Sequence, residues 1–473
     1  DVAAPLEELV SLVSARAGEK VGGLRERHKV AGRVDARVEI GQEGAGPTAI
    51  AVRVGAARGL EFDALGGRFG VGTTAGEAVL TIGRDADAVA FHGLEGEVWF
   101  NDGRMMTVEL DGEAPLLSRN DLAPEKESSL SVRLRGVKLD SGLSHAAIRA
   151  VLAGPGGDGG GARSAASEFR SGEPAATNSR WAWLETMDPR GEFDADLIVT
   201  PRRAKPEAAP VASPAVAGAG AGVGTEGPAS ATKAAHAPVV SLDRYTVTGS
   251  IWPRSVSLVY NGALLDLPSV TGRVVLGDRG GRIENLRAAA AEERWHIGID
   301  GSWQADRDAA GPGVKVDSRL TLAASSLDPS LVALLPKGIR DAMERSRVRM
   351  DGPFSIDGAR LAFWAPTGRR VEPPPGAKRI QVAPGAGVLL FNGELQLTEL
   401  TADAGVPVEY GAGTVAVLVQ RNYDDKEPLI DVTLRADTLS VGGVPMTGAK
   451  GRLVSSLRPG QLIVPQFTAE CLG

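Results

Sequence analysis

Apolar and polar residues alternate with a period of two along most of the chain. The pattern is clear at Leu130, Val132 and Leu134, and it fills residues 30–139 and the chain from residue 239 onward. Such alternation is typical of a β-strand with one apolar face, because successive side chains point to opposite sides of the strand. Turn dipeptides such as Asp102-Gly103 separate the runs. The pattern therefore predicts a mainly β protein.

Helical spacing of apolar residues is confined to short stretches. Residues 3–27 show it near the start of the chain, and a short helix is expected at 144–152. The clearest helix is SLDPSLVALLPKGIRDAMERSR, residues 326–347. Asp328 is suited to the N-cap, and Pro336 should break or kink the helix because proline lacks a backbone N–H. Helices are thus expected only between β modules.

Two stretches have no apolar period and are rich in Gly, Ala and Pro. They bury too little surface to offset the entropy lost on ordering, so we expect a flexible loop and a linker. The predicted organisation is a first β module with a leading helix at 1–153, a flexible loop at 154–180, the start of a second module at 181–199, a linker at 200–238, the remainder of the second module at 239–351 with its helix near 328–347, and a third, truncated module at 352–473.

A glycine-led strand recurs three times at nearly constant spacing. GRVDARVEI begins at Gly32, GEFDADLIV at Gly191 and GPFSIDGARLAF at Gly352, with intervals of 159 and 161 residues. Recurrence at a fixed interval indicates one structural unit that is used repeatedly. Each copy is interpreted as the strand that follows a helix, so the segment marks where one module follows another.

A second recurrence has the pattern of a hairpin. It begins at Gly96, Gly272 and Gly451, with intervals of 176 and 179 residues. Each copy is an alternating apolar run, a turn that contains glycine, and another alternating run. Two markers with similar periods favour an elongated repeat of antiparallel β-sheet modules over a single compact core.

Composition supports this fold class and narrows the partners. The chain has 473 residues, 61 of them glycine, and only 4% are aromatic. Its net charge of −7 and the lack of a basic stripe argue against nucleic-acid binding. A single cysteine, Cys471, excludes an internal disulfide. The chain begins at Asp1 and stops just after a strand-like segment, so we expect a piece of a longer protein.

Signals of catalysis or of a cofactor are weak in this sequence. The five histidines are far apart, with no pair at the spacing of a zinc site. GxGxxG occurs formally from Gly154 and from Gly222, but neither copy follows a strand and opens a helix, as a phosphate cradle requires. Paired carboxylates at Glu292-Glu293 and Asp424-Asp425 are typical of solvated turns. We therefore expect no enzyme, no metal and no cofactor.

Three segments resemble a known family. They are LDLPSVTGRVVLGDRGGRIENLRAAAAEERWHIGIDGSW, SLDPSLVALLPKGIRDAMERSRVRMDG and FNGELQLTELTADAG. They are similar to the AsmA-like envelope proteins of diderm bacteria, the group that includes TamB. In that family a Leu-Leu-Pro helix, here Leu334-Leu335-Pro336, leads into a glycine-led strand. The resemblance covers the β portions and neither low-complexity tract.

The resemblance implies an open, twisted half-pipe of β-sheet in the periplasm, part of the cell envelope. The protein would be anchored in the inner membrane through a segment outside this chain and would have an outer-membrane partner. Its apolar concave face would carry phospholipid acyl chains toward the outer membrane, in a role in outer-membrane biogenesis. The residues expected to line this groove are Trp295, Ile297, Ile299, Leu320, Leu322, Ile430, Val432 and Leu434.

Alternation of residues leaves other interpretations open. The same pattern is typical of closed β-sandwiches, in which a second sheet covers the apolar face. A periplasmic scaffold with such cores is the main alternative function. Aromatic residues near each other, Trp181 with Trp183 and Trp295 with Trp303, make a glycan-binding protein a further alternative, although aromatic residues on an apolar face usually belong to a core.

Overall fold

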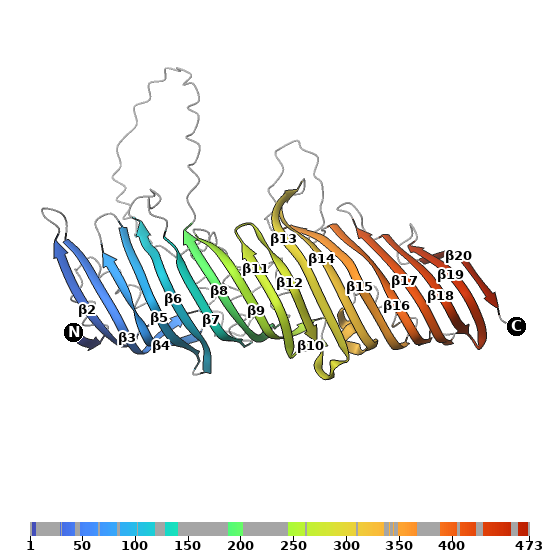
Figure 1. The fold of residues 1–473 in the computed structure, drawn as a ribbon, viewed down its shortest axis with the longest axis horizontal. Coiled ribbons are helices and arrows are strands. Elements are labelled where there is room, and N and C mark those ends of the chain that lie inside the picture. Colours follow the sequence, from blue (N-terminus) through green and yellow to red (C-terminus); the bar gives the residue numbers. More distant parts are fainter. Residues whose placement is uncertain are drawn as a thin grey trace, which may run out of the picture. The chain divides into compact units, whose positions relative to one another are not determined.

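The fold was analysed on a computed structural model of the chain. The residues that it describes are 2–5, 29, 31–42, 48–64, 67–82, 86–101, 103–118, 128–140, 188–201, 245–260, 263–308, 311–334, 340, 344, 349–366, 388–403, 407–421, 429–455 and 462–471. Almost all of them are in strands (Figure 1). The prediction of a mainly β protein is thus confirmed.

The chain divides into two compact units. Unit 1 consists of residues 1–104, 108–132 and 198–247. Its strands pair antiparallel with their neighbours in sequence, from the first strand to the fifth. These strands are β1 (Val2–Pro5), β2 (Ala31–Gln42), β3 (Thr48–Ala64), β4 (Gly67–Ile82) and β5 (Ala86–Phe100).

Unit 2 consists of residues 105–107, 133–197 and 248–473. Four strands contribute residues to both units: β6 (Gly103–Ser118), β7 (Leu130–Leu139), β8 (Arg190–Pro201) and β9 (Tyr245–Tyr260). The strands that lie wholly in unit 2 are β10 (Ala263–Leu267), β11 (Ser269–Gly277), β12 (Gly280–Ala289), β13 (Trp295–Asp308), β14 (Gly311–Ser326), β15 (Arg349–Pro366), β16 (Val388–Asp403), β17 (Pro407–Arg421), β18 (Leu429–Val441), β19 (Val444–Ser455) and β20 (Leu462–Cys471).

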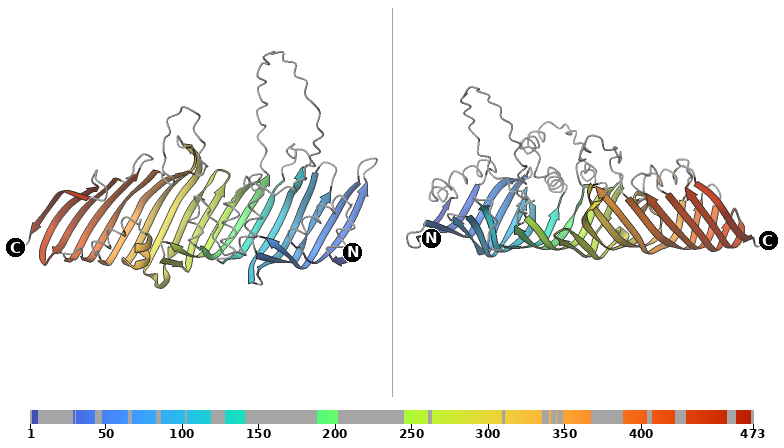
Figure 2. Two further views of the ribbon diagram at one scale, coloured as in Figure 1. Left: turned by 180° about the vertical axis from the view of Figure 1, so that it is seen from behind. Right: turned by 90° about the horizontal axis from the view of Figure 1, so that it is seen from above.

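The sheet of unit 2 is open and antiparallel. From β11 to β20 each strand pairs with the next along the chain, and β9 pairs with both β10 and β11. Viewed from above, the strands of this unit bend along their length, so the sheet is twisted and curved (Figure 2). All these strands belong to one sheet, and the described residues of unit 2 contain no second sheet that faces it. The expected open, twisted sheet is therefore confirmed.

Helices are few in the described residues of unit 2. They include a 3-10 turn, η2 (Ala291–Glu293), and one short helix, α6 (Pro329–Leu334). The helix begins where the sequence predicts, because Oδ1 of Asp328 accepts the Leu331 N–H at 3.0 Å as an N-cap. Its described residues are Pro329–Leu334, and in the remainder of the expected helix the structure describes only Arg340 and Glu344, both helical.

The expected leading helix is wrong at its first residues. Val2–Pro5 forms β1, which pairs antiparallel with residues 33–36 of β2, so no helix begins at residue 3. Pairing with a neighbouring strand overrides a weak local preference there. Residues 6–28, the expected helix at 144–152, the flexible loop at 154–180 and nearly all of the linker at 200–238 lie outside the described residues.

Unit 1 contains an aromatic ladder. Phe62, Phe69 and Phe100 lie directly opposite one another on β3, β4 and β5. The ring centroids are 5.5 Å apart for the first pair and 5.0 Å for the second. Phe69 and Phe100 are buried, as is Val98 on the same face of β5. Cross-strand aromatic pairs of this kind help to fix the register.

Irregular positions within several strands are stabilised by an aspartate of the next strand. Gly93, Gly136 and Asn285 have positive φ within a strand, at 54°, 59° and 50°. The N–H of each donates to an aspartate carboxylate on the next strand, at 3.1, 2.7 and 2.5 Å. These acceptors are Asp111, Asp194 and Asp300. The register shifts at Asn285 and next to Gly93 mark bulges there. A bulge adds a residue to one strand and increases the local bend and twist, so such sites contribute to curvature.

The recurring glycines have a structural reason at several of these sites. Gly272 lies opposite the bulge at Asn285, with φ 96°, and a Cβ on it would overlap the Asn285 carbonyl. Gly191 and Gly352 also have positive φ, at 154° and 116°. The hairpin predicted from Gly272 is confirmed as β11 and β12, and the one from Gly451 as β19 and β20. At Gly96, Gly191 and Gly272 the recurring segment therefore begins at a close backbone contact.

We predict that Gly272→Ala destabilises unit 2 far more than Gly443→Ala. Both residues have positive φ, at 96° and 79°, so alanine at either is strained by about 1–2 kcal/mol. At Gly443 a Cβ meets nothing within 4 Å, whereas at Gly272 it overlaps backbone atoms of Asn285. Urea unfolding should show an additional loss of roughly 2 kcal/mol for Gly272→Ala. Equal losses would contradict the role of this glycine at the bulge.

Candidate functional site: the apolar face of unit 2

The antiparallel register aligns apolar side chains into rows that cross the strands of unit 2. Ile297 of β13 lies opposite Leu322 of β14, which lies opposite Ile356 of β15. Because residues that pair directly point to the same side of a sheet, the whole row shares one face. We call it the first row; its remaining members, from β16 to β20, are Leu395, Val415, Leu434, Gly451 and Phe467.

A second row runs beside the first on the same face. Ile299 lies opposite Leu320, which lies opposite Ala359. Further along, Gly393 lies next to Ala359. The second row continues from Gly393 through Val417, Val432 and Leu453. Neither row contains a charged or polar side chain, so unit 2 presents a continuous aliphatic strip.

The predicted groove-lining residues all lie on this face. Ile297, Leu322 and Leu434 belong to the first row, and Ile299, Leu320 and Val432 to the second; Trp295 and Ile430 lie on the same face of their strands, beyond these rows. The structure thus brings together residues from β13, β14 and β18 that are up to 139 positions apart in sequence.

Sequence reasoning missed the members of the rows on β15, β16, β17, β19 and β20. Their alternation is visible in segments such as VLLFNGELQL and TVAVLVQ. On β15 a bulge between Ile356 and Arg360 interrupts the period, so Ala359 follows Ile356 on the same face after three residues instead of two. Allowing one skipped residue at each Asp-Gly within a strand would have found Ala359.

Burial along this face is uneven. Trp295 is only 1% exposed, whereas Ile297, Leu322, Val415 and Leu434 are half-buried. At the edge strand β20, Phe467 is 52% exposed. A face that was sealed against a second sheet would bury such residues almost fully. The apolar face is therefore partly open along the rows.

One local core covers the end of the face at β13 to β16. Leu331 of α6 packs with the buried residues Trp295, Ala324 and Phe354. Leu265 and Leu267 of β10 also contact this cluster, as do Leu322, Leu327, Ile297, Leu395 and Leu397. The helix lies on the face turned away from the viewer in Figure 1 and is seen from behind in Figure 2. Trp295 is thus a core residue under a helix, which corrects its expected role as an accessible groove-lining residue.

A short hydrogen-bond chain holds α6 against the sheet. The indole Nε1–H of Trp295 donates to Ser330 Oγ at 3.0 Å, and the Ser330 hydroxyl donates to Asp328 Oδ1 at 2.6 Å. The same carboxylate oxygen caps the helix by accepting the Leu331 N–H. Trp295 therefore has its polar atom satisfied although it is buried.

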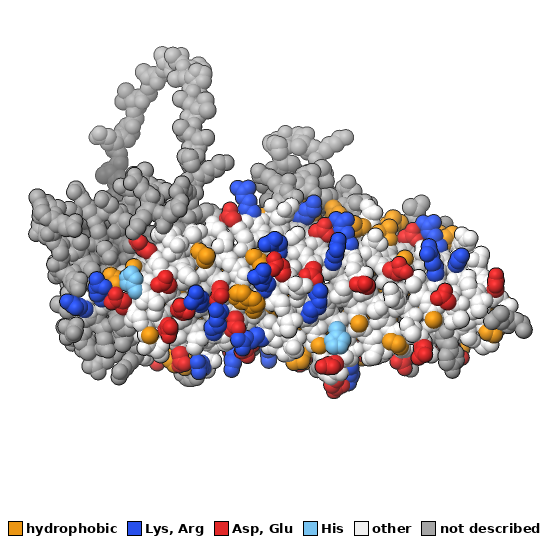
Figure 3. Space-filling model, in the orientation of Figure 1, with side chains coloured by type: hydrophobic (Ala, Val, Ile, Leu, Met, Phe, Trp, Pro, Cys, Tyr) orange, Lys and Arg blue, Asp and Glu red, His pale blue; other side chains and the backbone are white. Residues whose placement is uncertain are grey.

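The opposite face of unit 2 is charged. Neighbouring strands are joined there by pairs of arginine with a carboxylate, and basic and acidic side chains lie interspersed over the face seen in Figure 3. These pairs are Arg287 with Asp300 at 2.9 Å, Arg360 with Asp317 at 2.7 Å, Arg452 with Asp431 at 2.7 Å and Arg273 with Glu284 at 2.6 Å. Exposed pairs of this kind each stabilise the fold by at most about 1 kcal/mol.

The aspartates of these pairs have lowered pKa values. The hydrogen bond from Arg452 lowers the pKa of the Asp431 carboxyl, and the hydrogen bond from Arg360 does the same for Asp317. At Asp300 the main cause of the lowered pKa is the backbone N–H of Asn285 at the bulge. All three carboxylates are therefore held ionised by structural contacts and are poorly suited to act as general acids.

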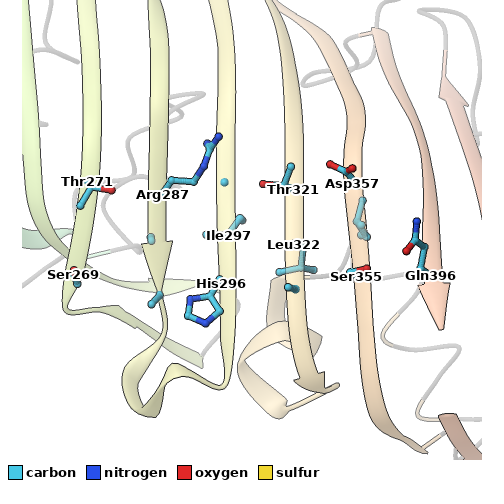
Figure 4. A pocket seen from close by; sticks show the side chains of 15 residues that line it. Ser269, Thr271, Arg287, His296, Ile297, Thr321, Leu322, Ser355, Asp357 and Gln396 are labelled. Carbon is cyan, nitrogen blue, oxygen red and sulfur yellow. The ribbon is translucent and has the colours of Figure 1, made fainter. Parts of the chain in front are cut away.

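A shallow cavity of about 620 Å³ opens on this charged face. Its wall includes hydroxyl and amide side chains such as Thr271, Thr321, Ser355 and Gln396, with His296 at its lower side (Figure 4). Arg287 borders it but is paired with Asp300. Ile297, Leu322 and Ile356 of the first row also line it, so the cavity has a mixed polar and apolar wall.

The described residues offer few groups for metal chemistry. Among them, no cluster of three or more His, Cys, Asp or Glu side chains could hold a metal ion. Cys471 is an exposed free thiol on β20. In the described part of the chain, no helix has the length and apolar character that crossing a bilayer requires.

Comparisons with known proteins give no match. No protein-family model, no curated protein and no solved structure is significantly similar to this chain. Inference about function therefore depends on the geometry of the apolar face.

We predict that Leu331→Ala destabilises unit 2, while Leu264→Ala changes its stability little. Leu331 is 4% exposed at the centre of the local core, and Leu264 is 63% exposed on β10. Truncating a buried leucine costs roughly 2–5 kcal/mol, and an exposed one less than about 0.5 kcal/mol. Urea unfolding should show this difference. A loss below about 1 kcal/mol for Leu331→Ala would contradict the close packing of α6 on the sheet.

We also predict that acid destabilises unit 2 in part through Asp431. Its pKa in the folded protein lies below the ordinary value of 3.8, so its contribution is present above pH 3.8 and is lost as the pH falls through the lower folded pKa. Arg452→Gln should weaken the dependence of the free energy of unfolding on pH in this range. The matched control is Arg435→Gln on the same face, since Arg435 is not among the causes of the shift. Equal weakening in both variants would contradict the assignment to Arg452.

Proposed function

We propose that this protein is a non-enzymatic lipid carrier that binds phospholipid acyl chains along the apolar face of unit 2. The observation that supports this most is the aliphatic strip, which crosses the strands from β13 to β20 on one side of an open sheet. Its side chains have no polar atoms, and most of them are only partly buried. Large apolar surfaces of this kind mark sites of interaction with apolar partners.

Apolar contact alone contributes enough free energy to hold an acyl chain on the strip. Each CH₂ group taken from water contributes about 0.8 kcal/mol, so half-burying a chain of about sixteen such groups contributes roughly 6 kcal/mol. The headgroup would stay in water at the rim of the trough, because the rows offer it no hydrogen-bond partner. An acyl chain could slide along the strip with little loss of contact, since apolar side chains follow one another across most of the strands.

The cellular setting of the proposal rests on the family resemblance. The three segments that resemble AsmA-like envelope proteins include β11 to β13, the residues around α6, and β16. By that likeness the protein would act in the periplasm of a diderm bacterium, between an anchor in the inner membrane and a partner at the outer membrane. The curved open sheet and its apolar face agree with such a role.

A periplasmic scaffold with closed β-sandwich cores is less well supported. Such cores would leave the residues of both rows almost fully buried. In unit 2, the described residues instead give local clusters, the largest of them beneath α6, and half-buried rows beyond it. A glycan platform also lacks support there, because Trp295 lies under α6 instead of facing a ligand.

We predict that the purified chain binds a fluorescent long-chain fatty acid and that Val432→Glu weakens this binding at least about tenfold. A carboxylate in the second row would have to be desolvated by the bound chain. The control is Thr433→Glu, which places the same charge on the opposite face one residue away. Native mass spectrometry of gently purified protein should also show bound phospholipid. A folded protein without lipid and without affinity for the probe would refute the proposal.

A further inference from the structure

The apolar face of unit 2 is not equally available along its length. Over β13 to β16 its edge is occupied by α6 and β10, which bury Trp295, Ala324 and Phe354. Leu322 and Ile297 in the first row pack against the same cluster. In this half of the strip, the protein itself fills part of the space that an acyl chain would need.

Over β17 to β20 the described residues place neither α6 nor β10 on the strip. Val415 and Leu434 in the first row are half-buried, as are Val417, Val432 and Leu453 in the second. A smaller cluster around Leu439 lies further along the same strands. Beside α6, by contrast, Ile356 and Ala359 of the rows are 9% and 2% exposed.

The end of the first row has a specific shape. Gly451 has no side chain, and the ring of Phe467 on β20 lies over it, with Cδ2 at 3.2 Å from where a Cβ would be. The Cβ of Leu434 is 3.9 Å from the same point on the other side. An aromatic ring above a cross-strand glycine supports the sheet at that position. It also leaves Phe467 52% exposed, as an apolar wall at the edge strand.

The chemistry of this stretch selects one type of occupant. Backbone N–H and C=O groups of β17, β18 and β19 are used in ladders with strands on both sides. The row side chains carry no donor or acceptor. A peptide or a sugar would leave its own polar groups without partners on this surface, which is costly. A saturated acyl chain has no such groups and gains from apolar contact alone.

We propose that the acyl-chain site lies on β17 to β20 and that the stretch beside α6 is not part of it. This inference rests on the proposed function and narrows it to one half of the strip. Three of the residues predicted from sequence, Ile430, Val432 and Leu434, are thereby placed in or next to the site. Its lining is Val415, Val417, Val432, Leu434, Leu453 and Phe467.

Site-specific photo-crosslinking tests this assignment. A benzophenone amino acid is placed singly at Val432, at Leu322, or at the opposite-face controls Thr433 and Thr321. Each variant is irradiated with vesicles of tritiated phosphatidylethanolamine, and radioactive adduct is measured on the purified chain. We expect about tenfold more adduct at Val432 than at Leu322 or either control, the difference that burying roughly two more CH₂ groups would give.

The outcomes separate this inference from the proposed function. Equal adduct at Leu322 and Val432, both above the controls, would overturn the restriction to β17–β20 while supporting acyl-chain binding. Adduct at control level at both positions would overturn both proposals. Crosslinks at Val432 to a second polypeptide instead of lipid would show that this stretch is a protein interface and would also overturn the assignment.

A second set of variants guards against misfolding caused by the probe. In these variants the benzophenone amino acid is placed at Leu453. Val417→Asn should reduce the lipid adduct at that probe at least about fivefold, because the amide of Asn would have no hydrogen-bond partner in the row once an acyl chain covers it. Ile299→Asn, in the same row on β13, should leave that adduct unchanged. Circular dichroism of both variants should match that of the parent. Equal loss of adduct in two folded variants would contradict a site confined to β17–β20.

Discussion

The antiparallel register is the constraint on which the rest of unit 2 depends. Side chains alternate between faces along each strand, so a shift of one residue between neighbours would move an entire apolar set to the charged side. From β13 to β20 the pairing keeps Ile297, Leu322, Val415 and Leu434 in one row. Arginine–carboxylate pairs such as Arg360 with Asp317 lie between neighbouring strands on the other face and penalise slippage there.

Bulges are what make a curved sheet compatible with that register. A residue with positive φ adds a position to one strand, and an aspartate on the next strand accepts its N–H. The facing strand must then approach closely, which explains glycine at Gly272 opposite Asn285. At Gly96, Gly191 and Gly272 the glycine of the recurring segment thus meets a requirement for close backbone approach. The glycines of the second recurrence do not all meet it in the same way, because Gly451 has an aromatic ring over it.

Much of the fold could be predicted from the sequence, because period-two alternation and turn dipeptides are local signals. The N-cap at Asp328 was predictable for the same reason. The role of Trp295 was not. Its place on the apolar face follows from alternation, but its burial depends on Leu331, which is 36 residues away and folds back over it. Local pattern also misjudged Val2–Pro5, where pairing with β2 decides the structure.

The covered and uncovered parts of the apolar face show how one strip can serve two purposes. Where α6 packs on it, the apolar face behaves as an ordinary core. Trp295, Ala324 and Phe354 are buried there, and the Trp295 indole is hydrogen-bonded. Beyond the helix the same alternation continues, although no described element has been added to use it as a core. An aliphatic surface left half-exposed to water costs free energy at every strand. That cost is offset if an apolar ligand covers the surface, and an acyl chain meets this need without adding polar groups to satisfy.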